Sequence, residues 1–232
     1  MFTDRIIIVT GAAGNVGGAV ARLLAARGAR VAAVDAVRAP LDAAAAALPH
    51  ADRHMACAGV DLTDPASCAA LVRRVSETFG GLHGVATTVG GFAMAPLDQT
   101  GMADWDKMFA LNVKTTWNIY QAAVPVLRAG GGGALVGIGS VAGLKGGARM
   151  APYAATKAAV LRLTESLADE LRPDRIRVNA VLPTTIDTPQ NRAAMPDADT
   201  SRWVTPEEVA ETMLFLLSGA ASGVTGALVQ VG

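Results

Sequence analysis

The sequence predicts an α/β domain in which about seven parallel strands form one doubly wound sheet flanked by helices. Segments of strand-like composition alternate with Ala- and Leu-rich segments of helical composition along the whole chain. The strand-like segments are continuously apolar, which is typical of parallel strands covered by helices on both faces. With 232 residues, of which 51% are hydrophobic, the chain is long enough for a substantial core. We therefore expect residues 1–232 to form a single domain.

The first half of the chain predicts three strand–helix units. The apolar run Ile6–Thr10 predicts the first strand, and an Ala- and Leu-rich helix follows it and runs through Arg27 to a stop at Gly28. The elements expected after it are the strand Arg30–Asp35, the Ala-rich helix Leu41–Leu48, the strand Met55–Asp61 and the helix Pro65–Phe79.

The second half continues the alternation. The strand Leu82–Val89 ends at a Gly-Gly pair, and Trp105–Ala129 predicts a long helix with an interruption near Pro125. After the turn Gly130–Gly133, the expected elements are the strand Ala134–Ser140, the helix Tyr153–Leu171, the strand Ile176–Leu182, the helix Pro206–Leu217 and the strand Ala227–Val231.

One connection stands apart from the others. The stretch Thr184–Val204 is rich in Pro, Thr, Asp and Asn, and it is too long for a simple link between two elements. Long connections inside a compact domain are usually functional. We therefore interpret residues 184–204 as a loop that contacts the substrate.

Composition argues against several classes of protein. The formal net charge is zero, which argues against nucleic acid as the main partner. The longest apolar runs are too short or too interrupted by glycine to span a membrane, and we expect no signal peptide before the first strand. Cys57 and Cys68 are expected to be packing residues, and with three scattered histidines they show no metal-site spacing. We expect a cytoplasmic protein without a metal site.

A glycine-rich turn follows the first strand. Gly11, Gly14 and Gly17 lie between a strand and a helix, which is the context of a dinucleotide-binding fingerprint. They would permit a tight turn, a close approach to a diphosphate, and close packing of the helix on the sheet. The pattern predicts a Rossmann fold whose dinucleotide contacts include Gly11, Ala13, Gly14, Asn15, Val16 and Gly17.

Residues at the ends of the second and third predicted strands indicate where the adenosine half of such a cofactor would bind. Asp35 closes the second strand, where a carboxylate can accept hydrogen bonds from ribose hydroxyls and would repel a 2′-phosphate. NAD(H) is therefore the preferred cofactor, while Arg38, three residues further on, leaves NADP(H) possible. Asp61 and Leu62 follow the third strand and are predicted to lie at the adenine.

Tyr153 and Lys157 are four residues apart in a predicted helix, so both side chains can point into one cavity. A free tyrosine has a pKa of about 10 and is a poor base at neutral pH. A positive charge beside the phenol would favour the phenolate and lower the pKa of Tyr153. The pair alone is also compatible with an ordinary surface helix, so the other motifs decide.

Together these motifs make the chain resemble the short-chain dehydrogenase/reductase family over nearly its whole length. Asn112 looks like the asparagine that the family carries in a helix. Ser140 lies thirteen residues before Tyr153, which is the usual interval in the family. The segment Asn179–Pro183, followed by Thr188, resembles the part that meets the nicotinamide.

The resemblance implies hydride transfer between a nicotinamide and a small carbonyl or alcohol substrate. Tyr153 would be the general acid and base, and Ser140 would hydrogen-bond the substrate oxygen. Lys157 would stabilise the phenolate and hold the nicotinamide ribose, and Asn112 would hold a water that links Lys157 to solvent. The family also implies a homodimer or homotetramer.

Further contacts follow from the same resemblance. Besides Tyr153 and Lys157, the residues expected at the nicotinamide half of the cofactor are Thr88, Gly90, Pro183, Ile186 and Thr188. The residues expected to line an apolar substrate pocket are Phe92, Met94, Met150, Met195 and Trp203.

Three positions depart from the common family pattern. The middle glycine of the turn is at Gly14, where the commonest fingerprint places it at the position of Asn15. Residues 87–90 read Thr-Thr-Val-Gly in place of Asn-Asn-Ala-Gly, which removes the usual asparagine support. Pro183 is followed by Thr184 in place of glycine, which predicts a stiffer turn.

Two alternatives stay open. Residues 181–199 and the Gly-Gly-Phe turn at 90–92 are similar to the same regions of dihydropteridine reductase, an NADH-using member of the family, which suggests a pterin-like substrate. A protein that senses NAD(P) without turnover is the other alternative. The intact Tyr153 and Lys157 pair disfavours it, because a sensor has no need of a proton donor.

Overall fold

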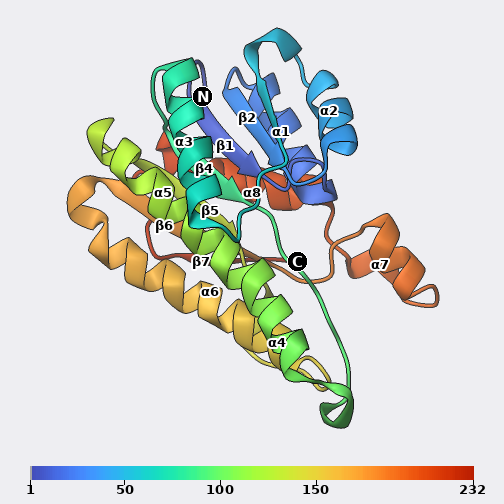
Figure 1. Ribbon diagram of the computed structural model, residues 1–232. Helices are drawn as coiled ribbons and strands as arrows, with labels where there is room; N and C mark the ends of the chain where they lie inside the picture. The colour runs from blue at the N-terminus through green and yellow to red at the C-terminus, as the bar shows by residue number, and fades with distance from the viewer. Residues whose placement is uncertain (1) are drawn as a thin grey trace.

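The computed structural model describes residues 2–232, which form one seven-stranded parallel sheet with strand order β3-β2-β1-β4-β5-β6-β7 (Figure 1). The strands are β1 (Ile6–Thr10), β2 (Arg30–Asp35), β3 (Met55–Ala58), β4 (Gly84–Thr87), β5 (Gly133–Ile138), β6 (Ile176–Pro183) and β7 (Leu228–Val231). The helices are α1 (Asn15–Ala26), α2 (Arg38–Ala46), α3 (Pro65–Phe79), α4 (Met102–Phe109), α5 (Thr115–Ala129), α6 (Ala151–Glu170), α7 (Pro189–Ala194) and α8 (Pro206–Leu217). The predicted doubly wound α/β fold is confirmed.

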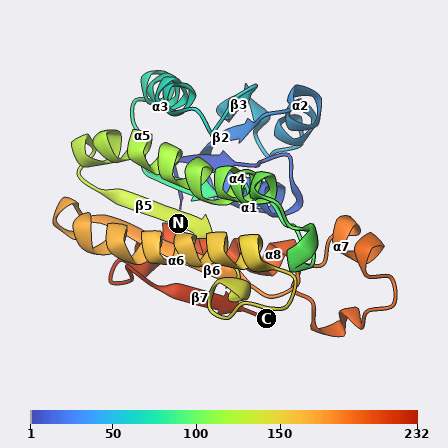
Figure 2. The ribbon, with the colours of Figure 1, turned by 60° about the horizontal axis from the view of Figure 1, so that its bottom comes forward.

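Helices cover both faces of the sheet (Figures 1 and 2). Helices α1 and α8 pack against each other on one face, and α3, α5 and α6 cover the other. Because successive strand residues point to opposite faces, Ile7 and Val9 of β1 join the core beneath α1 and α8, whereas Ile6 and Ile8 join the second core. All four side chains are buried, and each contributes about 1.5–3 kcal/mol through burial.

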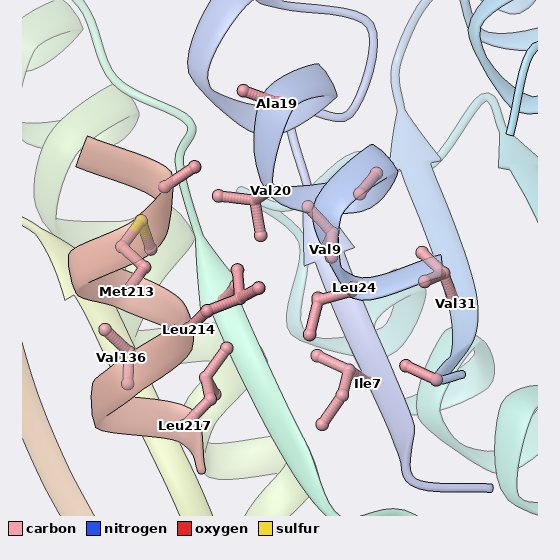
Figure 3. Packing of buried hydrophobic residues seen from close by; sticks show 14 of the residues in the cluster. Ile7, Val9, Ala19, Val20, Leu24, Val31, Val136, Met213, Leu214 and Leu217 are labelled. Carbon is pink, nitrogen blue, oxygen red and sulfur yellow. The ribbon is translucent and has the colours of Figure 1, made fainter. Parts of the chain in front are cut away.

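Figure 3 shows how the first core joins sequence-distant elements. Val20 and Leu24 of α1 point toward Leu214 and Leu217 of α8 across Ile7 of β1. The small residues of α1, such as the fully buried Ala19, let this helix lie close to the sheet. This packing holds the N-terminus of α1 at the end of β1.

Two strands are shorter than predicted. Strand β3 ends at Ala58 because Gly59 adopts a left-handed conformation, with φ of 74°. Strand β4 ends at Thr87, because the N–H of Thr88 donates to the Thr10 hydroxyl (3.3 Å) and not to a strand carbonyl. The ends of the other elements differ from the prediction by one to three residues, or not at all.

The predicted interruption of the long helix near Pro125 is wrong. Helix α5 continues through Pro125, which is exposed on the solvent side, where water can hydrate the carbonyl that lacks a backbone donor. The irregularity lies instead at Ala110–Lys114, a π-helical turn that joins α4 to α5. None of the helices in residues 2–232 is both long and apolar enough to span a membrane.

The long connection Thr184–Val204 contains a helix that the sequence analysis did not predict. Thr188 caps α7 by accepting the N–H of Asn191 (3.2 Å), and Pro189 occupies the first helical turn. A short parallel bridge between Ile186 and Val204 closes the connection at its base. Helix α7 therefore stands at the rim of the molecule, outside the two helical layers (Figures 1 and 2).

Candidate active site

A cleft of about 750 Å³ lies at the carboxyl ends of the strands. The sheet order reverses between β1 and β4, and ligands of open α/β sheets bind at such a switch point. The predicted site residues that line the cleft are Gly11, Gly14, Asn15, Val16, Gly17, Thr88, Gly90, Phe92, Met94, Ser140, Met150, Tyr153, Lys157, Pro183, Ile186, Thr188 and Met195. Residues far apart in the sequence therefore meet in one place.

The glycine turn makes one end of this cleft. Gly11 adopts φ of 67°, and a Cβ atom at Gly17 would lie 2.1 Å from the Gly11 carbonyl oxygen, so neither position has room for a side chain. Gly14 precedes α1 without a side-chain cap, and the first turn of α1 has no acidic residue. Free N–H groups at a helix N-terminus attract a diphosphate. The turn therefore fits the diphosphate of a dinucleotide.

Asp35 supports this turn from the end of β2. One carboxylate oxygen accepts the N–H of Ala13 (3.2 Å) and the other accepts the N–H of Val37 (3.4 Å). Neither Asp35 nor Ala13 lines the cleft itself. The carboxylate is half-exposed at the edge of the turn, where a ribose attached to the diphosphate would lie.

Asp61 and Leu62 lie outside the lining of the cleft. The Asp61 carboxylate accepts the N–H (2.8 Å) and the hydroxyl (2.7 Å) of Thr63, and these hydrogen bonds lower the pKa of Asp61. Leu62 is buried in the second core. Their predicted contact with an adenine stays a prediction.

Lys157 carries its ammonium group into the protein interior from α6. The side chain is buried, and Nζ donates to the Ile138 carbonyl (3.1 Å) at the end of β5. Nζ also lies 5.9 Å from the centre of the Tyr153 ring. Burial lowers the pKa of Lys157 to about 8, because a charged amine loses its hydration there.

Tyr153 lies one helical turn before Lys157 and faces the same cleft. Burial raises the pKa of Tyr153, and a hydrogen bond with the Ser140 side chain lowers it by a smaller amount. The expectation that Lys157 brings the pKa of Tyr153 below its ordinary value is therefore wrong for this geometry. Desolvation outweighs the Ser140 hydrogen bond, so the phenol is protonated at neutral pH.

Ser140 completes this group from the end of β5. Its hydroxyl accepts the N–H of Ala142 (3.2 Å), which caps a short 3₁₀ turn at Val141–Gly143. Ser140 is buried and lines the cleft beside Tyr153. The serine thus has both a structural role and a position from which its O–H can reach a bound oxygen atom.

Asn112 lies in the π-helical turn and does not line the cleft. Its side chain accepts the N–H of Gly91 (2.9 Å) and donates to the Gly91 carbonyl (3.2 Å) and to the Thr156 hydroxyl (3.1 Å). The side chain therefore joins the segment after β4 to α6. Its predicted role in holding a water stays a prediction.

Thr88, which stands where the family pattern has asparagine, bonds to the end of β1. Its hydroxyl donates to the Thr10 carbonyl (2.7 Å), and its N–H donates to the Thr10 hydroxyl (3.3 Å). These bonds tie the end of β4 to the end of β1, so the Thr-Thr-Val-Gly sequence still holds the floor of the cleft.

Although four of them lie in the predicted loop 184–204, nine lining residues were not individually predicted from the sequence. They are Gly91, Ile138, Gly139, Val141, Ala142, Thr184, Thr185, Asn191 and Ala194. Most of them are direct chain neighbours of residues that were predicted from the strand ends. The same strand ends could therefore have indicated them. Asn191 and Ala194 belong to α7, which Thr188-Pro189 could have revealed as a cap followed by an N-terminal proline.

One contact places α7 beside the glycine turn, and a second lies within the connection that carries α7. The Asn15 side chain donates to the Gln190 side chain (3.0 Å), and Arg192 pairs with Asp187.

Trp203, predicted as a substrate contact, is half-buried but does not line the cleft. Residues 2–232 contain no group of three or more His, Cys, Asp or Glu side chains that could hold a metal ion.

Comparisons with known proteins show which family the chain is similar to. Residues 5–199 match the family model described as short chain dehydrogenase. The chain is 37% identical to cis-4-hydroxycyclohexanecarboxylate dehydrogenase of Sinomonas cyclohexanicum, over 99% of this chain and 96% of that protein.

Solved structures show the same similarity. A short-chain type dehydrogenase/reductase from Mycobacterium ulcerans superposes with a TM-score of 0.93 at 33% identity, over 99% of this chain and 89% of that chain. NAD⁺-bound xylitol dehydrogenase superposes with a TM-score of 0.91 at 26% identity, over 99% and 98% of the two chains.

Proposed function

The chain belongs to the short-chain dehydrogenase family and is an oxidoreductase that uses a nicotinamide cofactor, and from that premise we propose its chemistry. It transfers a hydride between NAD(H) and a small carbonyl or alcohol compound, with Tyr153 as general acid and base. One observation carries this proposal: Ser140, Tyr153 and Lys157 line the same cleft as the glycine turn.

The residues of the cleft fit the cofactor in the order of its parts. The turn Gly11–Gly17 would hold the diphosphate, and Asp35 would accept hydrogen bonds from the adenosine ribose. The nicotinamide end would meet Lys157 through its ribose, together with Thr88, Gly90, Pro183, Ile186 and Thr188. When bound, the nicotinamide supplies a hydride to a carbonyl carbon or takes one from a carbinol carbon.

Tyr153 and Ser140 act on the substrate oxygen. As negative charge builds on a carbonyl oxygen during reduction, the protonated Tyr153 hydroxyl donates its proton there. The Ser140 hydroxyl donates a hydrogen bond to the same oxygen, and this bond strengthens as the charge grows. In oxidation the proton returns from the alcohol to Tyr153.

Lys157 supports the proton transfer. Its ammonium group is 5.9 Å from the Tyr153 ring centre and stabilises the phenolate left after the proton departs. A pKa of about 8 keeps Lys157 mostly charged at neutral pH. Asn112 positions the neighbouring segment through Gly91, and we assign to it the water that returns protons from solvent.

Replacing Tyr153 tests the proposal. Tyr153→Phe should lower kcat by about 10²–10⁴-fold, the usual contribution of a general acid, while the Kd for NADH changes less than about twofold. Tyr120→Phe is the matched control, because Tyr120 is buried outside the cleft and bonds to Thr87 (3.3 Å). Steady-state kinetics on ketones, alcohols and a quinonoid dihydropterin, with NADH fluorescence for binding, measure both effects.

The outcomes separate the alternatives. Undiminished turnover by the Tyr153→Phe variant would refute the acid assignment. Tight NADH binding by the wild type with no turnover of any compound would favour the sensor, and turnover of the dihydropterin alone would favour a pterin substrate. A cyclic alcohol belongs in the panel, because the relative from Sinomonas cyclohexanicum is named for one.

Asp35 is proposed to select NAD(H) over NADP(H). Asp35→Asn keeps an acceptor for the Ala13 N–H but removes the charge that would repel a 2′-phosphate, whereas Asp35→Ala removes both. Both variants should lower the NADH/NADPH ratio of kcat/KM by about tenfold or more, since one charge contact is worth over 1 kcal/mol. An unchanged ratio in the Asp35→Asn variant would show that the charge is not the selector.

Oligomeric state and location stay predictions. We propose a homodimer or homotetramer that packs through α5 and α6, and a sizing measurement in solution tests it. The cytoplasmic location rests on cysteine usage: Cys57 and Cys68 are both free and buried.

A further inference from the structure

The outer part of the cleft is apolar and exposed. Phe92, Met94 and Met195 all line the cleft, yet 63%, 52% and 39% of their surfaces are open to solvent. Large apolar side chains gathered at one opening mark a surface that a ligand covers. Val141, Ala142 and Met150 extend this lining inward toward Ser140 and Tyr153.

The lining of the cleft offers almost no ionic partner for a charged substrate. Among the described residues that line the cleft, Lys157 is the only charged one, and its ammonium group already donates to the Ile138 carbonyl. The nearby cation of α7, Arg192, pairs with Asp187. A carboxylate buried here would lose its hydration without compensation, which costs several kcal/mol.

Besides Tyr153, Phe92 is the one aromatic residue among the described residues that line the cleft. Its ring packs edge-on against Tyr153, with ring centres 4.9 Å apart and an interplanar angle of 76°. Two anchors fix the segment that carries it: Asn112 holds Gly91 on one side, and the Ala95 N–H donates to the Arg149 carbonyl (2.8 Å) on the other. The ring is therefore held beside the phenol and can pack against a substrate there.

From this arrangement we infer the substrate class, an inference that rests on the function proposed above. The substrate is a neutral compound whose carbonyl or carbinol carbon belongs to an apolar ring. Phe92 selects it by packing against that ring while the oxygen reaches Tyr153 and Ser140. The chain thus differs in preference from the relative whose name contains a carboxylate.

A matched pair of ketones tests the inference. Methyl 4-oxocyclohexanecarboxylate is neutral and 4-oxocyclohexanecarboxylate is an anion, while acetone has no ring. The wild type with NADH should show at least a tenfold higher kcat/KM for the ester than for the anion. Phe92→Ala should lower kcat/KM about tenfold for the ester, chiefly through KM, and less than threefold for acetone. Phe215→Ala, which removes an exposed phenylalanine of α8, should leave kcat/KM unchanged for both the ester and acetone.

Other results overturn the inference. An anion reduced as well as the ester would contradict the neutral class, and equal losses on acetone and the ester in the Phe92→Ala variant would contradict selection by Phe92. If none of the three ketones is reduced, turnover of the wider panel still decides the proposed function, and calorimetric titration of the same pair into the protein with NADH decides the substrate class. Tighter binding of the ester supports it, and equal or tighter binding of the anion refutes it.

Discussion

Lys157 illustrates the conflict between stability and function at the scale of one residue. An ammonium group at a buried position is destabilising unless it is well paired, and its one hydrogen bond goes to the neutral Ile138 carbonyl. The fall in its pKa from 10.5 to about 8 reflects this cost. The roles proposed for this cation, stabilising the Tyr153 phenolate and holding the nicotinamide ribose, would offset that cost.

Removing this charge should stabilise the fold and abolish the activity. A shift of one pKa unit corresponds to about 1.36 kcal/mol. Lys157→Met should therefore raise the free energy of unfolding at pH 7 by up to about 3 kcal/mol. The loss of the hydrogen bond to the Ile138 carbonyl reduces this gain. Between pH 8 and 10.5 Lys157 loses its proton in the folded wild type but keeps it in the unfolded chain. The free energy of unfolding of the wild type therefore rises with pH in this range, and its difference from that of the Lys157→Met variant shrinks. Urea titrations at pH 7 and 10 measure this.

Lys107→Met is the control for that prediction, because Lys107 is exposed on α4. Its unfolding free energy should stay within about 0.5 kcal/mol of the wild type. A Lys157→Met variant less stable than the wild type at pH 7 would mean that the ammonium group is better solvated than its burial indicates.

At the scale of elements, the end of α8 depends on a residue of another element. Arg177 of β6 donates to the carbonyls of Leu216 (2.6 Å), Leu217 (3.4 Å) and Ser218 (3.0 Å). The Leu216 and Leu217 carbonyls end the helix and lack helical donors, and the helix dipole places partial negative charge there. The guanidinium therefore caps α8 against the edge of the sheet.

Arg177→Met should destabilise the protein by about 1–3 kcal/mol, because it leaves carbonyl groups at a half-buried helix end without donors. Arg162→Met is a suitable comparison: Arg162 lies on α6 with a side chain 69% exposed and pairs only with Glu165, so its loss should cost less than about 0.5 kcal/mol. Thermal and urea unfolding measure both. Equal losses in the two variants would argue against a specific cap.

The π-helical turn shows what periodicity cannot predict. Trp105–Ala129 was predicted as one helix, and nothing in the residue spacing marks Ala110–Lys114 as wider than the rest. The turn is stabilised by tertiary bonds from Asn112 to Gly91 and Thr156, which belong to distant parts of the chain. Pro125 does lack a backbone N–H donor, as the sequence indicated, but this exposed proline does not interrupt α5.

At the scale of the molecule, the fold followed from local patterns. Strand ends such as Asp35 and Ser140 were recognisable, and parallel pairing brings such ends to one edge of the sheet. The geometry within the site was harder to predict. The raised pKa of Tyr153 depends on burial by several elements, and the placement of α7 beside Asn15 depends on a contact 175 residues apart.

The central claim is that the cleft joins a nicotinamide to a substrate oxygen at Tyr153. The most direct test is transfer of deuterium from NADH labelled at C4, prepared separately in its two stereochemical forms, to the ring ketone that the protein reduces fastest. We expect deuterium on the carbinol carbon from one labelled form only, since a single cleft fixes one face of the nicotinamide. Product that carries deuterium from neither form, with the new C–H hydrogen taken from solvent, would contradict it.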